Sequence, residues 1–400
     1  MEVNLGYKQT EVGVIPEDWV TSSLQNLCGA PITYGIVQCG PHVQDGVPYI
    51  RVSDMDAPEL DVSQMLRTSP EIAVKFSRST VQEGDLVYAL RGRLGEVRTV
   101  SAEVAGANLT QGTARISPKG AISGSYLLWA MRSLRLFKQA EIQAKGTTFR
   151  EITLADLRDL RVPLPPTKAE QRAIAAALSD VDALLGGLDR LIAKKRDLKQ
   201  AAMQYLLTGQ TRLPGFNSVW KVKRLGDVCR PQKGELITEA TAVPGEIPVV
   251  AGGKKPSYFH CRPNRTGKTI TISGSGAYAG FVSFFKVPIF ASDCSTIGES
   301  SSYSLDFIYY QLVLKQGDIY RSQTGGAQPH VHPSDIAPLI LHVPDDVLEQ
   351  AAIAAVLSDM DAGLAALETR RDKTRDLKQA MMQELLTGNT RLVNPEAVNA

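Results

Sequence analysis

A long segment of this chain occurs twice, and the internal repeat limits the folds that the chain can adopt. Residues 171–182 (QRAIAAALSDVD) return as residues 350–361 (QAAIAAVLSDMD), at an offset of 179 positions. Without any gap, RDLKQA at 196–201 returns at 375–380, and LLTG followed by TRL at 206–213 returns at 385–392. Register that is kept over this length indicates duplication, because chance does not preserve it.

The duplication includes more than the repeated segments. Pro165 matches Pro344, and the stretch from Trp19 to Leu24 is echoed from Trp220 to Leu225. Between these ends the two halves differ strongly. We therefore predict two related globular domains, each followed by one copy of the repeated segment, with these boundaries: 1–166 and 209–345 for the domains, 167–208 and 346–387 for the repeated segments, and 388–400 for a C-terminal tail.

Both repeated segments are predicted to be long helices. Thr167 with Glu170, and Asp346 with Glu349, have capping-box spacing just after prolines that cannot continue a helix backwards. A glycine follows the last apolar residues of each segment, where a left-handed cap would end the helix. A helix of about 38 residues would be roughly 57 Å long at 1.5 Å per residue.

Apolar residues in both helices are spaced alternately by four and three positions, as in a coiled-coil seam. They are Ile174, Leu178, Val181, Leu185, Leu188 and Ile192 in the first helix, and Ile353, Leu357, Met360, Leu364 and Leu367 in the second. One interpretation is that each helix packs only on its own domain. We favour the other, in which the two seams pack against each other as an antiparallel coiled coil with pseudo-twofold symmetry.

The globular regions are predicted to be α+β domains. Residues 85–90 and 269–272 are β-prone runs that follow a glycine, whereas 126–131 and 307–312 are typical of a helix turn packed on a sheet. Loops rich in glycine and small polar residues, such as LRGRLG at 90–95, would let the backbone approach a ligand closely.

Composition excludes some classes of protein. The chain is 43% apolar and 22% charged, it has no apolar run long enough to cross a bilayer, and Met1 is not followed by a secretory signal, so we expect a cytoplasmic protein without a membrane partner. Five scattered cysteines without a C-x-x-C pattern predict reduced thiols. The net charge of +2 does not by itself indicate nucleic-acid binding.

Two unlike domains on a stiff spacer suit a ligand that has two separated and different sites. Successive major-groove half-sites on DNA lie roughly 34 Å apart per helical turn, so a spacer of this length could hold the domains about one to one and a half turns apart. DNA is therefore compatible with the predicted geometry.

Several segments resemble the specificity subunits of type I restriction-modification enzymes. The helices share with that family a proline followed by Glu-Gln at the start, the Leu-Ser-Asp-x-Asp seam and the Leu-Leu-Thr-Gly end. The other similar segments are GYKQTEVGVIPEDW (6–19), GDLVYALRGRLG (84–95), NLTQGTA (108–114), TISGSGAYAG (271–280) and SDCS (292–295). The resemblance covers essentially the whole chain.

The resemblance implies a non-catalytic subunit in which two target recognition domains each read one half of a split, asymmetric site on double-stranded DNA. The implied partners are two methyltransferase subunits and two restriction (motor-nuclease) subunits. S-adenosylmethionine, ATP and magnesium would belong to those partners, with no cofactor or metal in this chain.

The residues themselves contain no strong catalytic pattern. The run from Thr266 to Thr269 (TGKT) lacks the first glycine of a phosphate-binding loop, which would fall at Arg262. The histidines and cysteines do not have the paired spacing of zinc ligands, and we expect His330 and His332 to line a loop or an edge strand instead.

Base recognition needs side chains with paired donors and acceptors on loops that enter a groove. Each candidate could equally be a solvated surface residue, whereas loops 146–150 and 325–329 are better supported because they hold equivalent positions before the repeated helices. The candidates are Arg91, Arg93, Asn108, Gln111, Thr147, Thr148 and Arg150 in the first domain, and Lys254, Lys255, Arg262, Arg265, Ser273, Ser275, Gln323 and Gln328 in the second.

Two other functions remain compatible with the sequence. The chain could be an adaptor or scaffold protein whose coiled coil spaces two protein-binding heads, or a specificity protein that serves a different defence methyltransferase. Neighbouring genes for a methyltransferase and a helicase-nuclease would separate these alternatives.

Overall fold

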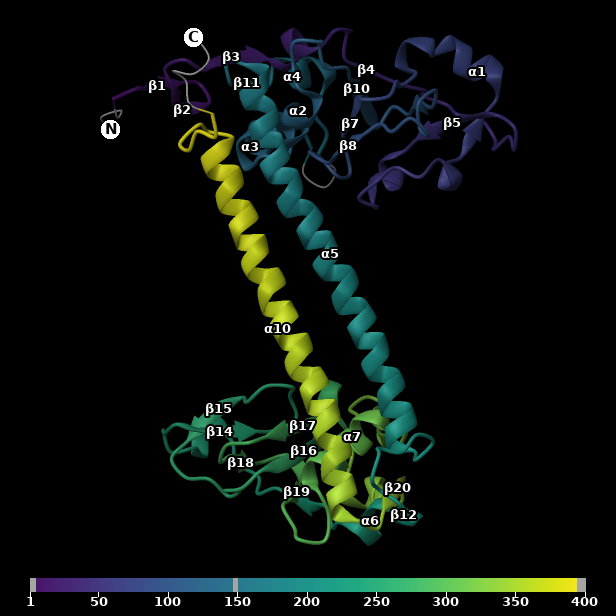
Figure 1. The fold of residues 1–400 in the computed structure, drawn as a ribbon, viewed down its shortest axis with the longest axis vertical. Helices are drawn as coiled ribbons and strands as arrows, with labels where there is room; N and C mark the ends of the chain where they lie inside the picture. The colour runs from purple at the N-terminus through teal and green to yellow at the C-terminus, as the bar shows by residue number, and fades with distance from the viewer. Residues whose placement is uncertain (1–4, 147–149, 394–400) are drawn as a thin grey trace. The chain divides into compact units, whose positions relative to one another are not determined.

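The computed structural model describes residues 5–146 and 150–393, and the chain divides into two compact units. Unit 1 comprises residues 1–187 together with 371–400, and unit 2 comprises residues 188–370. The long helices α5 (Lys168–Leu207) and α10 (Val347–Leu385) therefore each begin in one unit and end in the other (Figure 1). Each unit contains one globular domain and a part of both helices.

The two globular domains contain the same succession of strands. In the first domain, after the hairpin β1 (Tyr7–Thr10) and β2 (Gly13–Pro16), the strands are β3 (Val20–Ser23), β4 (Thr33–Tyr34), β5 (Val47–Ile50), β6 (Arg67–Thr68), β7 (Leu86–Ala89), β8 (Val97–Thr99), β9 (Asn108–Leu109), β10 (Thr113–Ile116) and β11 (Arg161–Leu164). In the second they are β12 (Trp220–Arg224), β13 (Gln232–Lys233), β14 (Ile247–Val250), β15 (Tyr258–His260), β16 (Thr269–Ser273), β17 (Val282–Phe285), β18 (Phe290–Ala291), β19 (Cys294–Gly298) and β20 (Ile340–Pro344).

These strands form matching sheets in the two domains. The four-stranded sheet β4-β10-β7-β8 corresponds to β13-β19-β16-β17, the three-stranded sheet β6-β5-β9 corresponds to β15-β14-β18, and the pair β11-β3 corresponds to β12-β20. In both three-stranded sheets one pair is parallel, β5 with β9 and β14 with β18. The duplication therefore includes the middle of each domain, where similarity between the two sequences is lost.

Short helices cover the sheets in both domains, which confirms the predicted α+β class. Helices α2 and α7 begin at the N-cap serines Ser123 and Ser304, whose hydroxyls accept from backbone N–H groups of the first turn, and they contact β8 and β17 respectively. The helices are α1 (Pro70–Lys75), α2 (Gly124–Met131), α3 (Leu134–Gln143) and α4 (Leu154–Asp159) in the first domain, and α6 (Leu225–Val228), α7 (Leu305–Leu314), α8 (Gln316–Arg321) and α9 (Pro333–Ile336) in the second.

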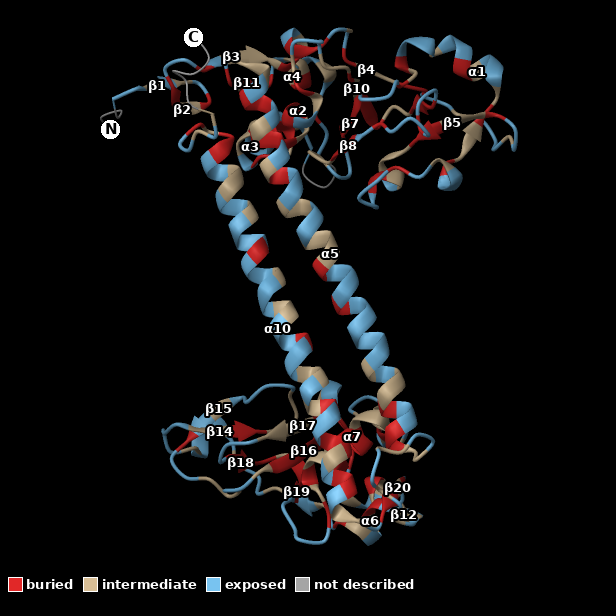
Figure 2. Ribbon diagram, in the orientation of Figure 1, coloured by how far each residue is buried: buried red, intermediate tan, exposed pale blue. Residues whose placement is uncertain are grey.

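The apolar seam of the long helices is buried at the domains and also beyond them. Ile174 and Leu178 belong to the hydrophobic core of unit 1, and Ile353 and Leu357 belong to that of unit 2, so the first turns of each helix pack on the preceding domain. Farther along, the buried seam residues, such as Leu188, lie outside these cores, while most of the surrounding helix surface is exposed (Figure 2). The first turns of each helix therefore pack on the preceding domain, and packing of the two seams against each other stays a prediction.

Ion pairs connect the two long helices within each unit. In unit 1, Lys378 of α10 contacts Asp182 of α5 at 2.5 Å. In unit 2, ion pairs join Arg196 with Glu368 and Lys199 with Asp361, so the α10 partner moves back along the sequence as the α5 residue advances. The helices are therefore antiparallel. The interlocking of side chains that defines a coiled coil remains a prediction.

The start of α10 shows why the repeat contains Glu-Gln. The Glu349 side chain is fully buried, and its carboxylate accepts hydrogen bonds from Arg212 at 2.6 and 2.9 Å, from Trp220 at 3.2 Å and from the Ser218 hydroxyl. Next to it, Gln350 bonds the backbone at both of its side-chain ends. Arg212 comes from the LLTG…TRL motif that follows α5, so this contact fastens the end of α5 to the start of α10.

Unit 1 contains the equivalent contact, made by the other copy of each motif. Arg391, which follows α10, bonds the buried carboxylate of Glu170 and also Asp18, and its guanidinium lies 5.9 Å from the Trp19 ring centre. The predicted N-cap at Thr167 is present, since its hydroxyl accepts from the Glu170 N–H at 3.2 Å. The capping-box role that the spacing suggested for the glutamate is wrong, because the carboxylate binds an arginine instead.

Acid is expected to destabilise unit 2 through Glu349. Burial alone would raise the pKa of this carboxyl, but hydrogen bonds from Arg212, Ser218 and Trp220 outweigh it and lower the pKa. The resulting stabilisation is present above the pKa of the unfolded chain, about 4.3, and is lost as the pH falls through the lower pKa of the folded state. Thermal unfolding measured from pH 7 to pH 3 should show a steeper loss for the wild type than for Glu349→Gln. Parallel curves would contradict this expectation.

Among the described residues, α10 alone has the length and apolar composition of a membrane span, with a mean hydropathy of 1.3 over the window tested. Its apolar residues Ile353 and Leu357 lie in the core of unit 2, and its opening glutamate is part of a buried ion pair. These contacts identify α10 as a helix of the folded units.

Candidate nucleic-acid interface

Four loops meet at one edge of the first domain. The backbone N–H of Leu90 donates to Gly112 O at 2.9 Å, and the N–H of Ile152 donates to Leu90 O at 3.0 Å. Beside these bonds, Arg91 forms an antiparallel bridge with Glu151, which also bridges Lys145. We call this set of loops the first loop cluster; it comprises residues 51–53, 91–95, 110–112, 145–146 and 150–151.

Four loops meet in the same way in the second domain. The N–H of Gly274 donates to Asp293 O, and the N–H of Val331 donates to Gly274 O, both at 2.9 Å. Ser275 bridges His330, which also bridges Thr324. This second loop cluster comprises residues 251–255, 274–280, 292–293 and 324–330. The bonds match those of the first cluster one for one, which places Ser275 at the position of Arg91 and His330 at the position of Glu151.

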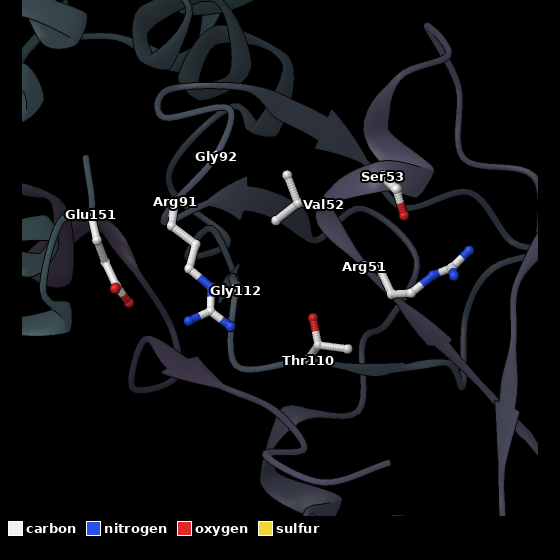
Figure 3. A pocket seen from close by; sticks show the side chains of 8 residues that line it. All are labelled: Arg51, Val52, Ser53, Arg91, Gly92, Thr110, Gly112 and Glu151. Atoms are coloured by element: carbon white, nitrogen blue, oxygen red, sulfur yellow. The ribbon is translucent and has the colours of Figure 1, made fainter. Parts of the chain in front are cut away.

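The first loop cluster surrounds a cavity of about 560 Å³ (Figure 3). Two of its lining positions are glycines, one of which, Gly92, has a φ of +71° that a side chain would disfavour. The lining residues are Arg51, Val52, Ser53, Arg91, Gly92, Thr110, Gly112 and Glu151. Guanidinium, hydroxyl and carboxylate groups thus share one hollow with exposed backbone.

The predicted arginines of the first domain differ in their partners. Arg93 forms an ion pair with Asp56 at 2.8 Å, and Arg150 forms one with Glu141. Arg91, in contrast, makes no ion pair within the described part of the chain, and its side chain extends into the cavity. Among these candidates, Arg91 is the one whose charge is left for an external ligand.

The other candidates of the first domain have unequal accessibility. Asn108 is only 1% exposed, and its amide binds Ser79, the Leu109 N–H and two carbonyl groups, so it fixes the loop rather than facing a ligand. We remove Asn108 from the candidates for this reason. Gln111 is partly exposed beside the cavity lining. Thr147 and Thr148 lie outside the described residues.

The second loop cluster presents a different set of groups. The Ser275 hydroxyl donates to the Asp293 carboxylate, so an acceptor-rich group stands where the first cluster has Arg91. Lys254 places its ammonium 4.9 Å from the ring centre of Tyr278 and 5.1 Å from that of Phe281. Lys255, Arg262 and Gln328 are exposed. The predicted loop location of His330 is confirmed by its bridges.

The polar groups of three predicted readers of the second domain are bonded within the protein or buried. Arg265 donates to Thr296, Asn264 O and Lys233 O, and Gln323 donates to Ala279 O at 2.8 Å. Ser273 is 3% exposed. Their polar groups are committed or buried, so Lys254, Lys255, Ser275, Arg262 and Gln328 remain the accessible candidates.

Sequence reasoning missed several residues that belong to these clusters. Arg51 and Thr110 follow the parallel strands β5 and β9, and Glu151 follows the predicted loop by one residue. The position of Glu151 could have been found from its equivalence to His330, at the offset of 179 that the repeat defines. Arg51 carried no such signal, because the repeat is unrecognisable in that part of the sequence.

The described residues contain no group of three or more histidine, cysteine or acidic side chains that could hold a metal ion. The two clusters are instead equivalent edges of duplicated domains, with polar groups on loops and with side chains that differ between the domains. This arrangement defines a two-domain protein whose halves share a scaffold and differ in the surface that they present to a ligand.

A family model described as "Type I restriction modification DNA specificity domain" matches residues 16–193 and 217–374. The two matched segments together make up most of the chain and correspond to its two copies. The chain belongs to the type I restriction-modification DNA specificity family, as the resemblance predicted.

Curated relatives agree with this assignment. The type I restriction enzyme EcoBI specificity subunit of Escherichia coli is 27% identical over 49% of this chain and 43% of the relative. The putative type I restriction enzyme MjaX specificity subunit of Methanocaldococcus jannaschii is 23% identical over 96% of this chain and 97% of the relative. The chain spans about half the length or less of the first curated relatives it matches. Both of these relatives are named as specificity subunits, in agreement with the family model.

A solved structure supports the fold. The crystal structure of a type I restriction-modification system S subunit from M. genitalium is similar with a TM-score of 0.64 and 18% identity, and the match covers 96% of this chain and 98% of that chain. At this identity the similarity concerns the fold alone, which is the predicted arrangement of two α+β domains with two long helices.

Proposed function

We propose that this chain recognises a bipartite, asymmetric site on double-stranded DNA, with the first loop cluster reading one half and the second loop cluster reading the other. The observation that carries the proposal is the equivalence of the two clusters: the same backbone bonds present Arg91 and Glu151 in one domain and Ser275 and His330 in the other. Equivalent loops with unlike side chains suit two different half-sites, because base edges are distinguished by their donors and acceptors.

We further propose that the chain directs two methyltransferase subunits and two restriction subunits to that site, and that S-adenosylmethionine, ATP and magnesium act in those subunits. Within unit 2, Leu191, Leu198 and Tyr205 of α5 recur every seven positions and are 40 to 52% exposed. Aligned apolar side chains on an exposed helix are typical of a protein-binding surface. We assign this stripe to partner subunits. The adaptor alternative has less support, since the family is one of DNA specificity domains.

Alanine at Arg91 is expected to reduce modification of the cognate site by about 5- to 150-fold, equivalent to roughly 1–3 kcal/mol for a lost base contact. Nonspecific DNA binding should fall much less. Alanine at Arg93 should have a smaller effect, because Asp56 already pairs with that guanidinium. The measurement compares methylation of a cognate duplex with binding of an unrelated duplex, using the chain together with its methyltransferase partner.

Lys119→Ala serves as the matched control. Lys119 is exposed and follows β10 at the end opposite to the loop that lines the cavity, so its loss removes one positive charge from unit 1 without touching the cluster. If Arg91→Ala loses cognate modification and nonspecific binding to the same extent, Arg91 contacts a phosphate and takes no part in base recognition.

A further inference from the structure

The cavity of the first loop cluster contains opposite charges that do not neutralise each other. Arg91 and Glu151 face each other across an antiparallel bridge, so their side chains project from the same side of the backbone pair. Both side chains line the cavity (Figure 3). Within the described part of the chain they form no ion pair with each other, and neither forms one with another residue. The cavity therefore offers a ligand both the forked donor of Arg91 and the carboxylate acceptor of Glu151.

The neighbouring arginine does not share this property. Arg51 also lines the cavity, but its guanidinium bonds Asp54 at 2.6 and 3.2 Å. Asp54 in addition accepts from the Arg51 backbone N–H at 2.7 Å, which fixes the loop that follows β5. The charge of Arg51 is satisfied internally, which leaves Arg91 as the donor for an external ligand.

The position of Arg91 is set by the backbone on both sides. The bonds from Leu90 to Gly112 and from Ile152 to Leu90 hold its chain, and the two reciprocal bonds between Lys145 and Glu151, at 2.9 and 3.0 Å, hold the opposite strand. A Cβ on Gly112 would come within 3.2 Å of the Arg91 Nε, so the glycine provides room for the arginine stem. The backbone that presents the pair is therefore held before any ligand binds, which lowers the cost of recognition.

The Glu151 carboxylate favours contact with a base edge over contact with a DNA phosphate. A DNA phosphate would suit Arg91 alone, but it would be repelled by the Glu151 carboxylate beside it. The major-groove edge of a G·C pair needs both groups, because guanine O6 and N7 accept from an arginine fork and cytosine N4 donates to a carboxylate. We propose that Arg91 and Glu151 together read one G·C base pair, with Arg91 on guanine and Glu151 on cytosine. This inference rests on the proposed function and specifies one position of the half-site that unit 1 reads.

The second domain is built to read something else. Ser275 and His330 hold the equivalent positions, and the Ser275 hydroxyl is bonded to Asp293. The Arg–Glu combination is thus confined to unit 1, and the corresponding position of the other half-site is not read in the same way.

The test is a genome-wide map of modified sequences made by the full chain co-expressed with its methyltransferase partner. The wild-type motif should contain a G·C pair in one half-site. In Arg91→Ala the preference for G·C at that position should fall at least 10-fold, while the gap and the other half-site stay unchanged. Glu151→Gln, which exchanges an acceptor for a group that can also donate, should relax the same position. Lys119→Ala, outside the loop cluster, is the control and should leave the motif intact.

Three results would overturn the proposal. They are a wild-type map whose half-sites contain no G·C pair, an Arg91→Ala map in which modification drops but selectivity at every position is kept, and a Glu151→Gln map with an unchanged motif. Should Arg91→Ala fail to fold, Arg91→Lys keeps the charge without the fork and should still relax the position. Absence of any split motif in the wild type would instead contradict the proposed function, so the two failures are distinguishable.

Discussion

Replacing Arg212 with alanine is expected to lower the free energy of unfolding of unit 2 by about 3 kcal/mol. The reason is the partner that remains: Glu349 is fully buried, and Arg212 supplies two of its four hydrogen bonds. A buried charge that loses its counterion keeps its desolvation penalty. Hydrogen exchange of peptides from β16 and β19, which form the sheet in the core of unit 2, measures this loss.

A double mutant tests whether the cost of Arg212→Ala comes from the unpaired Glu349 charge that is left buried. The combination Arg212→Met with Glu349→Leu removes both charges and should recover most of the stability lost in Arg212→Ala, because apolar replacement of a buried pair is often close to neutral. Arg391→Ala is the matched control, since it breaks the equivalent contact with Glu170 and should destabilise unit 1 while unit 2 is unchanged. A cost below about 1 kcal/mol for Arg212→Ala would contradict the account of the Glu-Gln motif.

The long helices could be predicted almost to the residue because their signals are local. A seam with alternating spacing, a proline before each start and a glycine after each end are independent of the rest of the fold, and Gly209 and Gly388 do adopt φ values of +72° and +77°. The repeat also showed which positions matter, Glu170 and Glu349 among them. It did not show that each carboxylate binds the arginine that follows the other long helix, because these contacts join residues 137 and 221 positions apart.

The candidate site was less predictable. Strand order in the middle of each domain depends on long-range pairing, such as the parallel contact of β5 with β9, and the sequences there have lost their similarity. Glycine content and the repeat pointed to loops that do meet in the two clusters, but they did not show how the individual side chains are placed there. Asn108 has an amide that could bind a base edge, but internal hydrogen bonds occupy that amide. Glu151 had no feature in the sequence that marked it as a reader, and yet it lines the cavity.

Lengthening both long helices together is expected to widen the gap between the two half-sites without changing either of them. Insertions of three heptads after Gly187 and after Arg370 fall at the boundaries between the units and keep the seam in phase. They add about 31 Å of helix, close to one turn of DNA, so the gap should grow by about 9–10 base pairs. Mapping the modified sequences of the lengthened chain measures the new gap.

Two controls sharpen this prediction. Insertion into α5 alone breaks the antiparallel register of the ion pairs between the helices and should abolish modification. Insertion of a single heptad in both helices keeps the seam but adds only about 10 Å, or roughly three base pairs, which turns the second half-site to another face of DNA. A longer chain that recognises an unchanged gap would show that the helices do not set the spacing.

The central claim is that the two domains read two different half-sites, and the most direct measurement is the genome-wide map of bases modified when the unaltered chain is co-expressed with its methyltransferase partner. The account predicts an asymmetric motif in two parts with a gap of fixed length, one part sensitive to Arg91→Ala and the other to Lys254→Ala. A continuous motif, a symmetric one, or modification without any motif would contradict it.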